Sequence, residues 1–209
     1  VLQNPLILLA GGRNATVYAQ EGSEDFEELS IEELKKLGLN ENDAVVALSA
    51  SGRTPYAKGA LKYAKEVGAA HIAVSCSRNA ELSKFGEVAI EVVTGAEVIT
   101  GSTRLKAGTA QKMILNMLST GSMIKSGKVY GNYMVDVRAG NHKLVERSKK
   151  IIVDCTGVSR EEAEKYLEIS EGKVKLAVFM ILSQLNKEES IKVLEENDNT
   201  IYKALQAIK

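Results

Sequence analysis

The 209 residues can bury the hydrophobic core of one or two domains, and their 27 basic and 27 acidic side chains cancel to a formal net charge of zero. No overall field therefore draws the chain to nucleic acid or to an anionic membrane, and we expect a small-molecule partner bound at a local site. Two cysteines, Cys76 and Cys155, and two histidines, His71 and His142, provide too few ligands for a disulfide framework or a zinc cluster, so we expect a reducing cytoplasm and no metal.

Four short apolar runs rich in β-branched residues occur in the first half of the chain, and each ends in small or polar residues. They are residues 6–12 (LILLAGG), 44–51 (AVVALSAS), 71–77 (HIAVSCS) and 88–94 (VAIEVVT). We expect all four to be buried strands. Helical patterns separate them, and this alternation predicts a parallel α/β sheet whose ligands bind beyond the carboxyl ends of the strands.

Helix signals lie between these runs. Ser30 and Glu33 have the spacing of a capping box, which predicts a helix that begins at Ser30 and ends at Gly38. Pro55 at a first-turn position and Gly68 past the last turn predict a second helix.

A longer helix is predicted over residues 107–126, where apolar residues repeat at helical spacing. We expect them to form one buried face: Ala110, Met113, Ile114, Met117, Leu118, Gly121 and Ile124. The polar positions between them exclude a membrane span. The methionines are expected to fill the core rather than to bind a cofactor.

From residue 143 onward the signals are helical. Capping boxes are predicted at Ser159 with Glu162 and at Asn186 with Glu189. Residues 174–182 (VKLAVFMIL) are apolar nearly all round, so neighbouring helices or another subunit must cover them. We expect two domains, 1–142 and 143–209, of which the second is small and all helical.

The chemistry concentrates first in residues 49–55 (SASGRTP), which connect a strand to a helix. The hydroxyls of Ser49, Ser51 and Thr54, with nearby backbone N–H groups, can converge on an anion at the helix N-terminus, and Gly52 allows close approach of the backbone. Neither the Walker A spacing nor GxGxxG is present. The alternative is an ordinary Ser/Gly turn in which Thr54 caps the helix.

A second hydroxyl-rich loop is "TGSTRLKAGTAQK" at residues 100–112. It offers Ser102 and Thr103 as small donors and Arg104 and Lys106 as charged ones, in the same strand-end layer. Two hydroxyl loops at one cleft are suited to a phosphorylated sugar.

Three stretches carry a resemblance to a known family: residues 50–64 (ASGRTPYAKGALKYA), 100–121 (TGSTRLKAGTAQKMILNMLSTG) and 127–144 (GKVYGNYMVDVRAGNHKL). They resemble the signature of the N-acetylmuramic acid 6-phosphate etherases, which belong to the sugar isomerase (SIS) superfamily. The second stretch is shared with the related glucokinase regulatory protein. The resemblance extends through nearly the whole chain, including the C-terminal helices.

The resemblance implies a three-layer SIS-type parallel sheet flanked by helices, followed by the small helical domain. It implies a cofactor-independent lyase that releases D-lactate from N-acetylmuramic acid 6-phosphate and leaves N-acetylglucosamine 6-phosphate, in the recycling of cell-wall sugars in a bacterial cytoplasm. In the family mechanism a carboxylate removes the C2 hydrogen of the ring-opened sugar, the lactyl ether leaves C3, and water adds to the intermediate. A homodimer is expected, since SIS domains resemble one another in pairing.

One catalytic carboxylate is assigned through the resemblance. Residues 20–25 (QEGSED) resemble the family segment with a catalytic glutamate, and the matching residue is Glu24. From local sequence alone, Glu24 after Ser23 reads as a surface carboxylate in the first turn of a helix. Glu97, ahead of the second loop, is a weaker candidate that either binds the sugar or has a structural role.

The chain departs from the family at its beginning. The family has N-terminal helices, a first strand, a further phosphate loop and a second catalytic glutamate before the point where "VLQNPLILLAGG" begins. Because the strand order of SIS domains resembles 2-1-3-4-5, the absent strand belongs between residues 6–12 and 44–51. We expect the sequence to be part of a longer protein; the alternatives are a complementary polypeptide or an altered sheet.

Two other functions stay open beside the etherase. One is a non-catalytic sugar-phosphate-binding regulator of the glucokinase regulatory protein type. The other is an incomplete subunit that needs a complementary chain.

Overall fold

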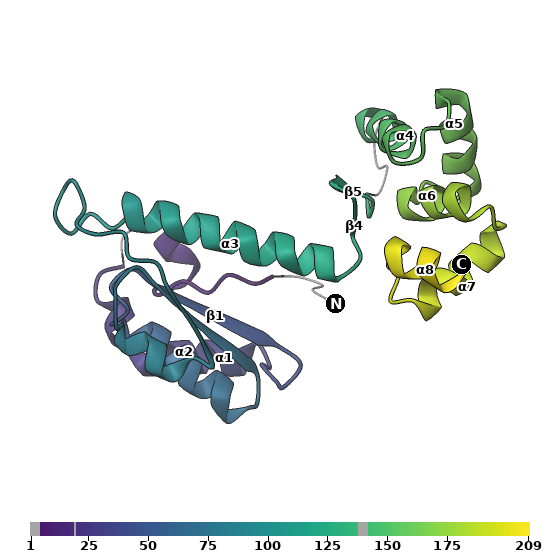
Figure 1. Ribbon diagram of the computed structural model, residues 1–209. Coiled ribbons are helices and arrows are strands. Elements are labelled where there is room, and N and C mark those ends of the chain that lie inside the picture. The colour runs from purple at the N-terminus through teal and green to yellow at the C-terminus, as the bar shows by residue number, and fades with distance from the viewer. Residues whose placement is uncertain (1–4, 19, 138–141) are drawn as a thin grey trace. The chain divides into compact units, whose positions relative to one another are not determined.

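A computed structural model describes residues 5–18, 20–137 and 142–209 (Figure 1). The chain divides into two compact units that separate between Met117 and Leu118. The first unit contains a parallel sheet with its helices, and the second is helical apart from a short hairpin. Within the described residues, no helix combines the length and the apolar character that crossing a membrane requires.

The sheet of the first unit has three parallel strands in the order β1 (Ala44–Ser49), β2 (Ala70–Ser75) and β3 (Val88–Glu91). These strands confirm three of the four predicted runs. The register pairs Ser49 with Ser75 and Ser75 with Glu91, so a row of polar residues crosses the carboxyl end of the sheet. Ligands of parallel α/β sheets bind beyond this end of the strands, so the row places polar side chains where a ligand would bind.

The predicted strand at residues 6–12 is wrong. Residues 5–9 form no regular element, residues 10–12 form a turn, and a short 3-10 helix, η1 (Arg13–Thr16), follows. Ile7 is 93% exposed and Leu6 is 69% exposed. A lone apolar run has no partner for its backbone hydrogen bonds, and in Figure 1 this segment lies apart from the strands.

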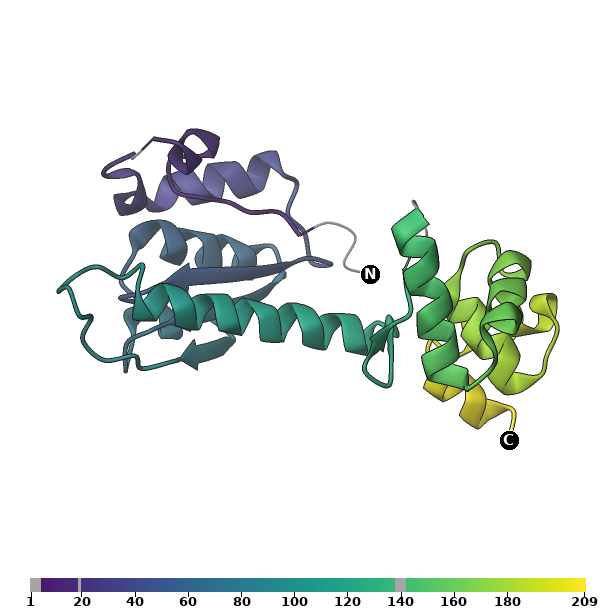
Figure 2. The same ribbon diagram turned by 90° about the horizontal axis from the view of Figure 1, so that it is seen from above.

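Helix α2 (Pro55–Glu66) lies between the sheet and helix α1 (Glu27–Lys36), as Figure 2 shows. A Cβ atom on Gly59 would lie 2.3 Å from the carbonyl oxygen of Glu27 and 2.8 Å from Ser30 Oγ, so the two helices cross closely at Gly59. The predicted Pro55 start and Gly68 end of α2 are confirmed, with Gly68 at φ +78°.

The predicted capping box at Ser30 is wrong, because α1 begins three residues earlier, at Glu27. Ser30 is fully buried inside the helix, where its Oγ donates to the carbonyl of Glu27 at 2.9 Å. Instead of a cap, two contacts to α2 fix α1. The Tyr56 hydroxyl donates to the Glu33 carboxylate, and Lys62 Nζ lies 2.6 Å from Glu27 Oε2.

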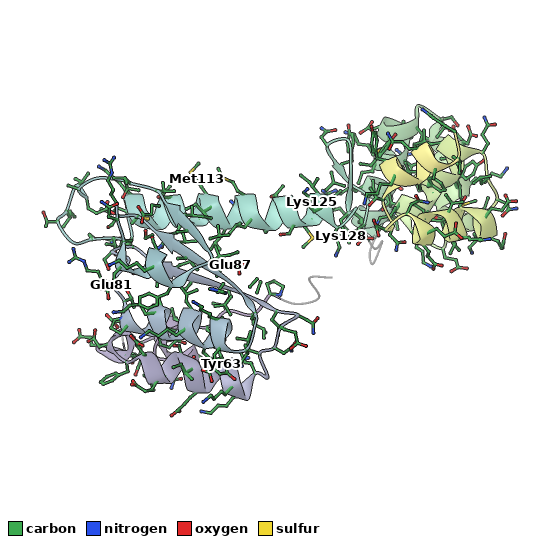
Figure 3. The ribbon with its side chains drawn as sticks, turned by 60° about the horizontal axis from the view of Figure 1, so that its bottom comes forward. Tyr63, Glu81, Glu87, Met113, Lys125 and Lys128 are labelled. Atoms are coloured by element: carbon green, nitrogen blue, oxygen red, sulfur yellow. The ribbon has the colours of Figure 1, made fainter. Side chains whose placement is uncertain are left out.

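Helix α3 (Lys106–Lys125) confirms the predicted long helix, but its predicted buried face is wrong. Of that apolar set, Ile114 is buried, whereas Met113, Met117 and Ile124 are 52%, 65% and 53% exposed. Figure 1 shows the first half of α3 on the face of the sheet opposite α2, and Figure 3 shows Met113 on the outer side of the helix. Three strands offer α3 too little surface to cover the whole stripe.

The second unit begins with the end of α3 and the hairpin of β4 (Val129–Tyr130) and β5 (Tyr133–Met134). Five helices follow, which agrees with the prediction that the chain is helical from residue 143 onward: α4 (His142–Thr156), α5 (Arg160–Ile169), α6 (Val174–Ser183), α7 (Lys187–Glu196) and α8 (Ile201–Ala207). The other helices of the unit surround α6, in which Val174, Ala177, Val178 and Phe179 are fully buried.

Of the two capping boxes predicted in this unit, that at Asn186 is confirmed, and at Ser159 the side-chain cap of the helix is confirmed. Ser159 Oγ accepts the N–H of Glu162 at 3.1 Å at the start of α5. Asn186 and Glu189 form a reciprocal capping box at the start of α7. The helix starts were therefore readable from local sequence.

Candidate functional site

The loop after β1 is ordered by its own hydroxyls. Ser49 Oγ and Thr54 Oγ1 lie 2.8 Å apart, and Ser49 Oγ also accepts the N–H of Gly52 at 3.0 Å. Thr54 occupies the N-cap position of α2, but its hydroxyl is bonded to Ser49 rather than to the helix. The structure thus brings together Ser49, Gly52 and Thr54, and it leaves Ser51 exposed at the tip of the loop.

The backbone conformation and the close packing at position 52 both favour glycine. Its φ of +68° is in the left-handed region, and a Cβ atom there would lie 2.4 Å from Ala80 Cβ and 3.1 Å from Ser75 Cβ. The Gly52 carbonyl accepts the N–H of Leu82 at 2.8 Å. The loop is therefore pressed against the segment that follows β2.

Cys76 connects this loop with the start of α3. Its N–H donates to the Ala50 carbonyl at 3.0 Å, and its thiol lies 3.6 Å from the carbonyl of Ala107. Burial, followed by the negative charge of Glu97, raises the pKa of the Cys76 thiol. The Cys76 thiol is therefore uncharged at neutral pH, and the residue lies between the two predicted ligand loops. The sequence did not indicate this position.

Glu97 is placed as a cap for α3. Its carboxylate accepts the N–H of Lys106 at 2.9 Å and the N–H of Ala107 at 3.0 Å. These bonds, first that from Ala107 and then that from Lys106, hold the pKa of Glu97 below its ordinary value. A carboxylate at this position satisfies N–H groups of the first turn and interacts favourably with the helix dipole.

The loop before α3 is more open than the first. Ser102 is half-buried, and Thr103 and Arg104 are exposed. The Ser102 N–H donates to the Ile99 carbonyl at 2.9 Å, and Lys106 Nζ donates to the Ala96 carbonyl at 2.7 Å. The ammonium group of Lys106 therefore stabilises its own loop, and a ligand phosphate would compete for it.

Glu24 lies on a 3-10 helix, η2 (Ser23–Asp25), where it is exposed. The η2 segment packs against α2. Among the described residues, neither a hydrogen bond nor an ion pair joins Glu24 to residues 49–54 or to residues 100–106. The structure therefore places Glu24 on the sheet unit but does not bring it into contact with the hydroxyl loops.

Glu91 is a residue of this region that the sequence analysis missed. Its carboxylate, at the end of β3, accepts hydrogen bonds from Asn79 N, Ala80 N and Ser83 Oγ. The signal in the sequence is faint, a single acidic residue in an apolar strand. In the described part of the chain, no group of three or more His, Cys, Asp or Glu side chains is arranged to hold a metal ion.

A three-strand parallel sheet with hydroxyl loops at its carboxyl edge, followed by a helical unit, defines an α/β protein of the SIS type. The SIS domain family matches residues 28–121, and the C-terminal lid domain of glucokinase regulatory protein matches residues 131–193. Both matches agree with the predicted fold class, an SIS-type α/β domain followed by a helical domain.

Curated relatives specify the family. The chain is 56% identical over 197 residues to N-acetylmuramic acid 6-phosphate etherase of Bacillus cereus (strain ATCC 10987 / NRS 248), covering 94% of this chain and 67% of the relative. It is 53% identical over 201 residues to the protein of that name from Clostridium beijerinckii, covering 96% of this chain and 66% of the relative. The chain belongs to the N-acetylmuramic acid 6-phosphate etherase family, and it spans about two thirds of the length of these relatives.

Proposed function

We propose that this chain takes part in cleaving the D-lactyl ether of N-acetylmuramic acid 6-phosphate, a lyase reaction that yields N-acetylglucosamine 6-phosphate and D-lactate. The observation that carries this proposal is the identity of 53–56% to named etherases over nearly the whole chain. The proposed setting is the recycling of cell-wall sugars in a bacterial cytoplasm. The proposed sugar-phosphate-binding domain is residues 1–142 and the proposed helical domain is residues 143–209, although the compact unit that contains helices α4–α8 extends back to Leu118.

The substrate phosphate is proposed to bind at the start of α2. Ser51 is exposed at the loop tip, the Ser49–Thr54 pair fixes the loop, and the N-terminus of α2 adds partial positive charge. Ser102 and Thr103 are the proposed donors from the second loop. Glu97 holds the start of α3 in place beneath them, which favours the structural of its two predicted roles.

Binding of N-acetylglucosamine 6-phosphate tests this assignment. Ser51→Ala and Thr54→Ala should each weaken the affinity measured by titration calorimetry about tenfold, the cost of about one hydrogen bond to a charged group. Ser126→Ala, a hydroxyl at the end of α3 that donates to the Ser122 carbonyl, is the control. Unchanged affinity in both loop variants would show that the phosphate does not bind at this loop.

Glu24 is proposed as one acid/base residue of the reaction. Its exposure leaves the carboxylate accessible to a substrate, and the neighbouring Glu27 is engaged by Lys62 at 2.6 Å. Glu24→Gln should reduce the rate of lactate release by about 100-fold or more, the usual contribution of general acid–base catalysis, while sugar-phosphate affinity stays the same. Glu28→Gln, the same change on the first turn of α1, is the matched control.

The assay of lactate release also separates this proposal from a purely regulatory function. An etherase releases lactate in proportion to enzyme, whereas a sugar-phosphate sensor binds the ligand without turnover. Phosphosugar binding without any lactate release by the full-length protein would replace the proposed reaction with the regulatory one.

A homodimer is proposed as the assembly. Helix α3 carries no charged residue from Met113 to Ile124 and exposes Met113, Met117 and Ile124, a surface more typical of an interface than of a solvated helix. Light scattering should give the mass of two chains, and Met117→Lys should shift it toward one. A monomeric wild type would contradict this assembly.

A further inference from the structure

The carboxylate of Glu91 is saturated by donors from one short segment. Glu91 Oε1 accepts Ser83 Oγ at 2.6 Å and the N–H of Ala80 at 2.9 Å, and Oε2 accepts the N–H of Asn79 at 2.8 Å. These bonds, that from Ser83 first, lower the pKa of Glu91. Glu91 is therefore an anion at neutral pH, and its charge is used to hold residues 79–83.

Residues 79–83 in turn hold the hydroxyl loop. Ala80 is 5% exposed and occupies the space where a Cβ atom on Gly52 would be, at 2.4 Å. The N–H of Leu82, a fully buried residue, donates to the Gly52 carbonyl at 2.8 Å. Steric contact and a hydrogen bond therefore both transmit the position of residues 80–82 to Gly52.

The turn contains one residue in an uncommon backbone conformation. Asn79 has φ of +53°, a left-handed conformation that asparagine adopts more readily than other residues with side chains but that still costs up to about 1 kcal/mol. Its N–H is one of the three donors to Glu91. The bond from Asn79 to Glu91 offsets this cost, so the shape of the turn depends on a residue eight positions beyond its last donor, Ser83.

We propose that Glu91 is a positioning residue of the sugar-phosphate site: through the turn of residues 79–82 it fixes the backbone of Gly52 in the phosphate-binding conformation without touching the substrate. This inference rests on the proposed function, because it takes the ligand of the Gly52 loop to be a sugar phosphate. The carboxylate keeps its negative charge, and its three hydrogen bonds direct it toward residues 79–83.

Glu91→Gln tests the inference while preserving the size of the side chain. Whichever way the amide is turned, its NH2 group meets an N–H or O–H donor of residues 79–83. KM for the substrate should rise about tenfold and kcat should change by less than about threefold, because the phosphate is gripped equally in the ground state and the transition state. A loss of folded protein alone would lower the apparent kcat and leave KM unchanged.

Two further variants frame this result. Glu87→Gln makes the same change just before β3. Glu87 is half-exposed, and its Oε2 lies 3.6 Å from His71 Nδ1. The KM of this variant should stay within about twofold of wild type, because an exposed ion pair contributes little. Figure 3 shows Glu87 away from Glu81, which begins η3 (Glu81–Phe85) next to the turn. Ser83→Ala removes one donor and keeps the carboxylate, so its KM should rise about threefold.

Hydrogen exchange provides a readout that is independent of the ligand. Glu91→Gln should speed exchange of the Leu82 amide, which is bonded to Gly52, without speeding exchange of the Val74 amide in β2. If wild type releases lactate and Glu91→Gln leaves KM unchanged, or lowers kcat alone, the inference is overturned. If wild type neither binds the sugar phosphate nor releases lactate while Leu82 exchange responds, the proposed function fails and the coupling of Glu91 to Gly52 stands.

Discussion

At the scale of single residues, Gly52 has the least freedom to change. Gly52→Ala must place a side chain at φ +68° and within 2.4 Å of Ala80 Cβ, so we expect a loss of about 2–4 kcal/mol in the free energy of unfolding. The loop must also move, so affinity for N-acetylglucosamine 6-phosphate should fall. Urea unfolding and titration calorimetry measure the two effects.

Gly38, just past the end of α1, provides the control for Gly52. It also has a positive φ, +71°, and a Cβ atom there would meet nothing within 4 Å. Gly38→Ala should therefore cost about 1 kcal/mol, the backbone contribution alone. Equal losses in the two variants would show that the contact with Ala80 carries no energy.

Part of the site was predictable at this scale because part of it is local. Ser49, Gly52 and Thr54 bond within five residues of one another, so a strand–turn–helix pattern was sufficient to propose them as a group. Cys76 and Glu91 contact residues of other segments of the chain, and a single cysteine or glutamate in the sequence does not reveal such a contact. Whether Ser51, Ser102, Thr103 and Glu24 contact the substrate stays a prediction.

At the scale of elements, the crossing of α1 and α2 depends on Gly59. Gly59→Ala would gain helix propensity, but its Cβ would lie 2.3 Å from the Glu27 carbonyl and force the helices apart. We expect a net loss of about 2–3 kcal/mol in the free energy of unfolding. Gly121→Ala in α3, with nothing within 4 Å, should instead gain up to about 1 kcal/mol. Chemical denaturation of both variants distinguishes packing from propensity.

The start of α3 should respond to acid through Glu97. Its pKa in the folded state is below the ordinary 4.5, so the cap stabilises the fold above pH 4.5 and this contribution is lost as the pH falls through the lowered pKa. Glu97→Gln should therefore be less stable than wild type at neutral pH, and the difference should shrink below pH 4.5. If the difference persists unchanged in acid, the negative charge of Glu97 is not the source of the stabilisation.

Element boundaries were predictable wherever a local cap or a breaking residue defined them. Pro55, Gly68, Ser159 and Asn186 all mark helix ends as expected. Residues 6–12 have the composition of a strand, yet strand formation requires a neighbour, which composition cannot supply. The prediction that the apolar stripe of α3 is buried was wrong for a related reason, because periodicity identifies an apolar face but not the surface that covers it.

At the scale of the whole molecule, each unit has its own core. The core of the sheet unit is small, with Ala47, Ala57, Leu61, Ala73 and Leu82. The helical unit buries more and larger side chains, including Phe179, which is fully buried. The sheet unit should therefore unfold first, because alanines bury little apolar surface.

Calorimetry on two core variants checks this difference. Leu61→Ala should lower only the first thermal transition and Phe179→Ala only the second, at costs of about 2–5 kcal/mol each. Leu37→Ala, which shortens a side chain that is 50% exposed, should leave both nearly unchanged. A single transition that moves with either core variant would show that the two units unfold together.

The thiol of Cys76 gives the site a built-in chemical reporter. Cys76 is 6% exposed, its N–H is bonded to the Ala50 carbonyl and its sulfur lies 3.6 Å from the Ala107 carbonyl, so an alkylating reagent should reach the thiol mainly when the turn after β1 and the start of α3 part. The rate of modification at Cys76 therefore reports how often these two segments part, and a ligand that draws them together slows that rate without any change in the reagent or the thiol.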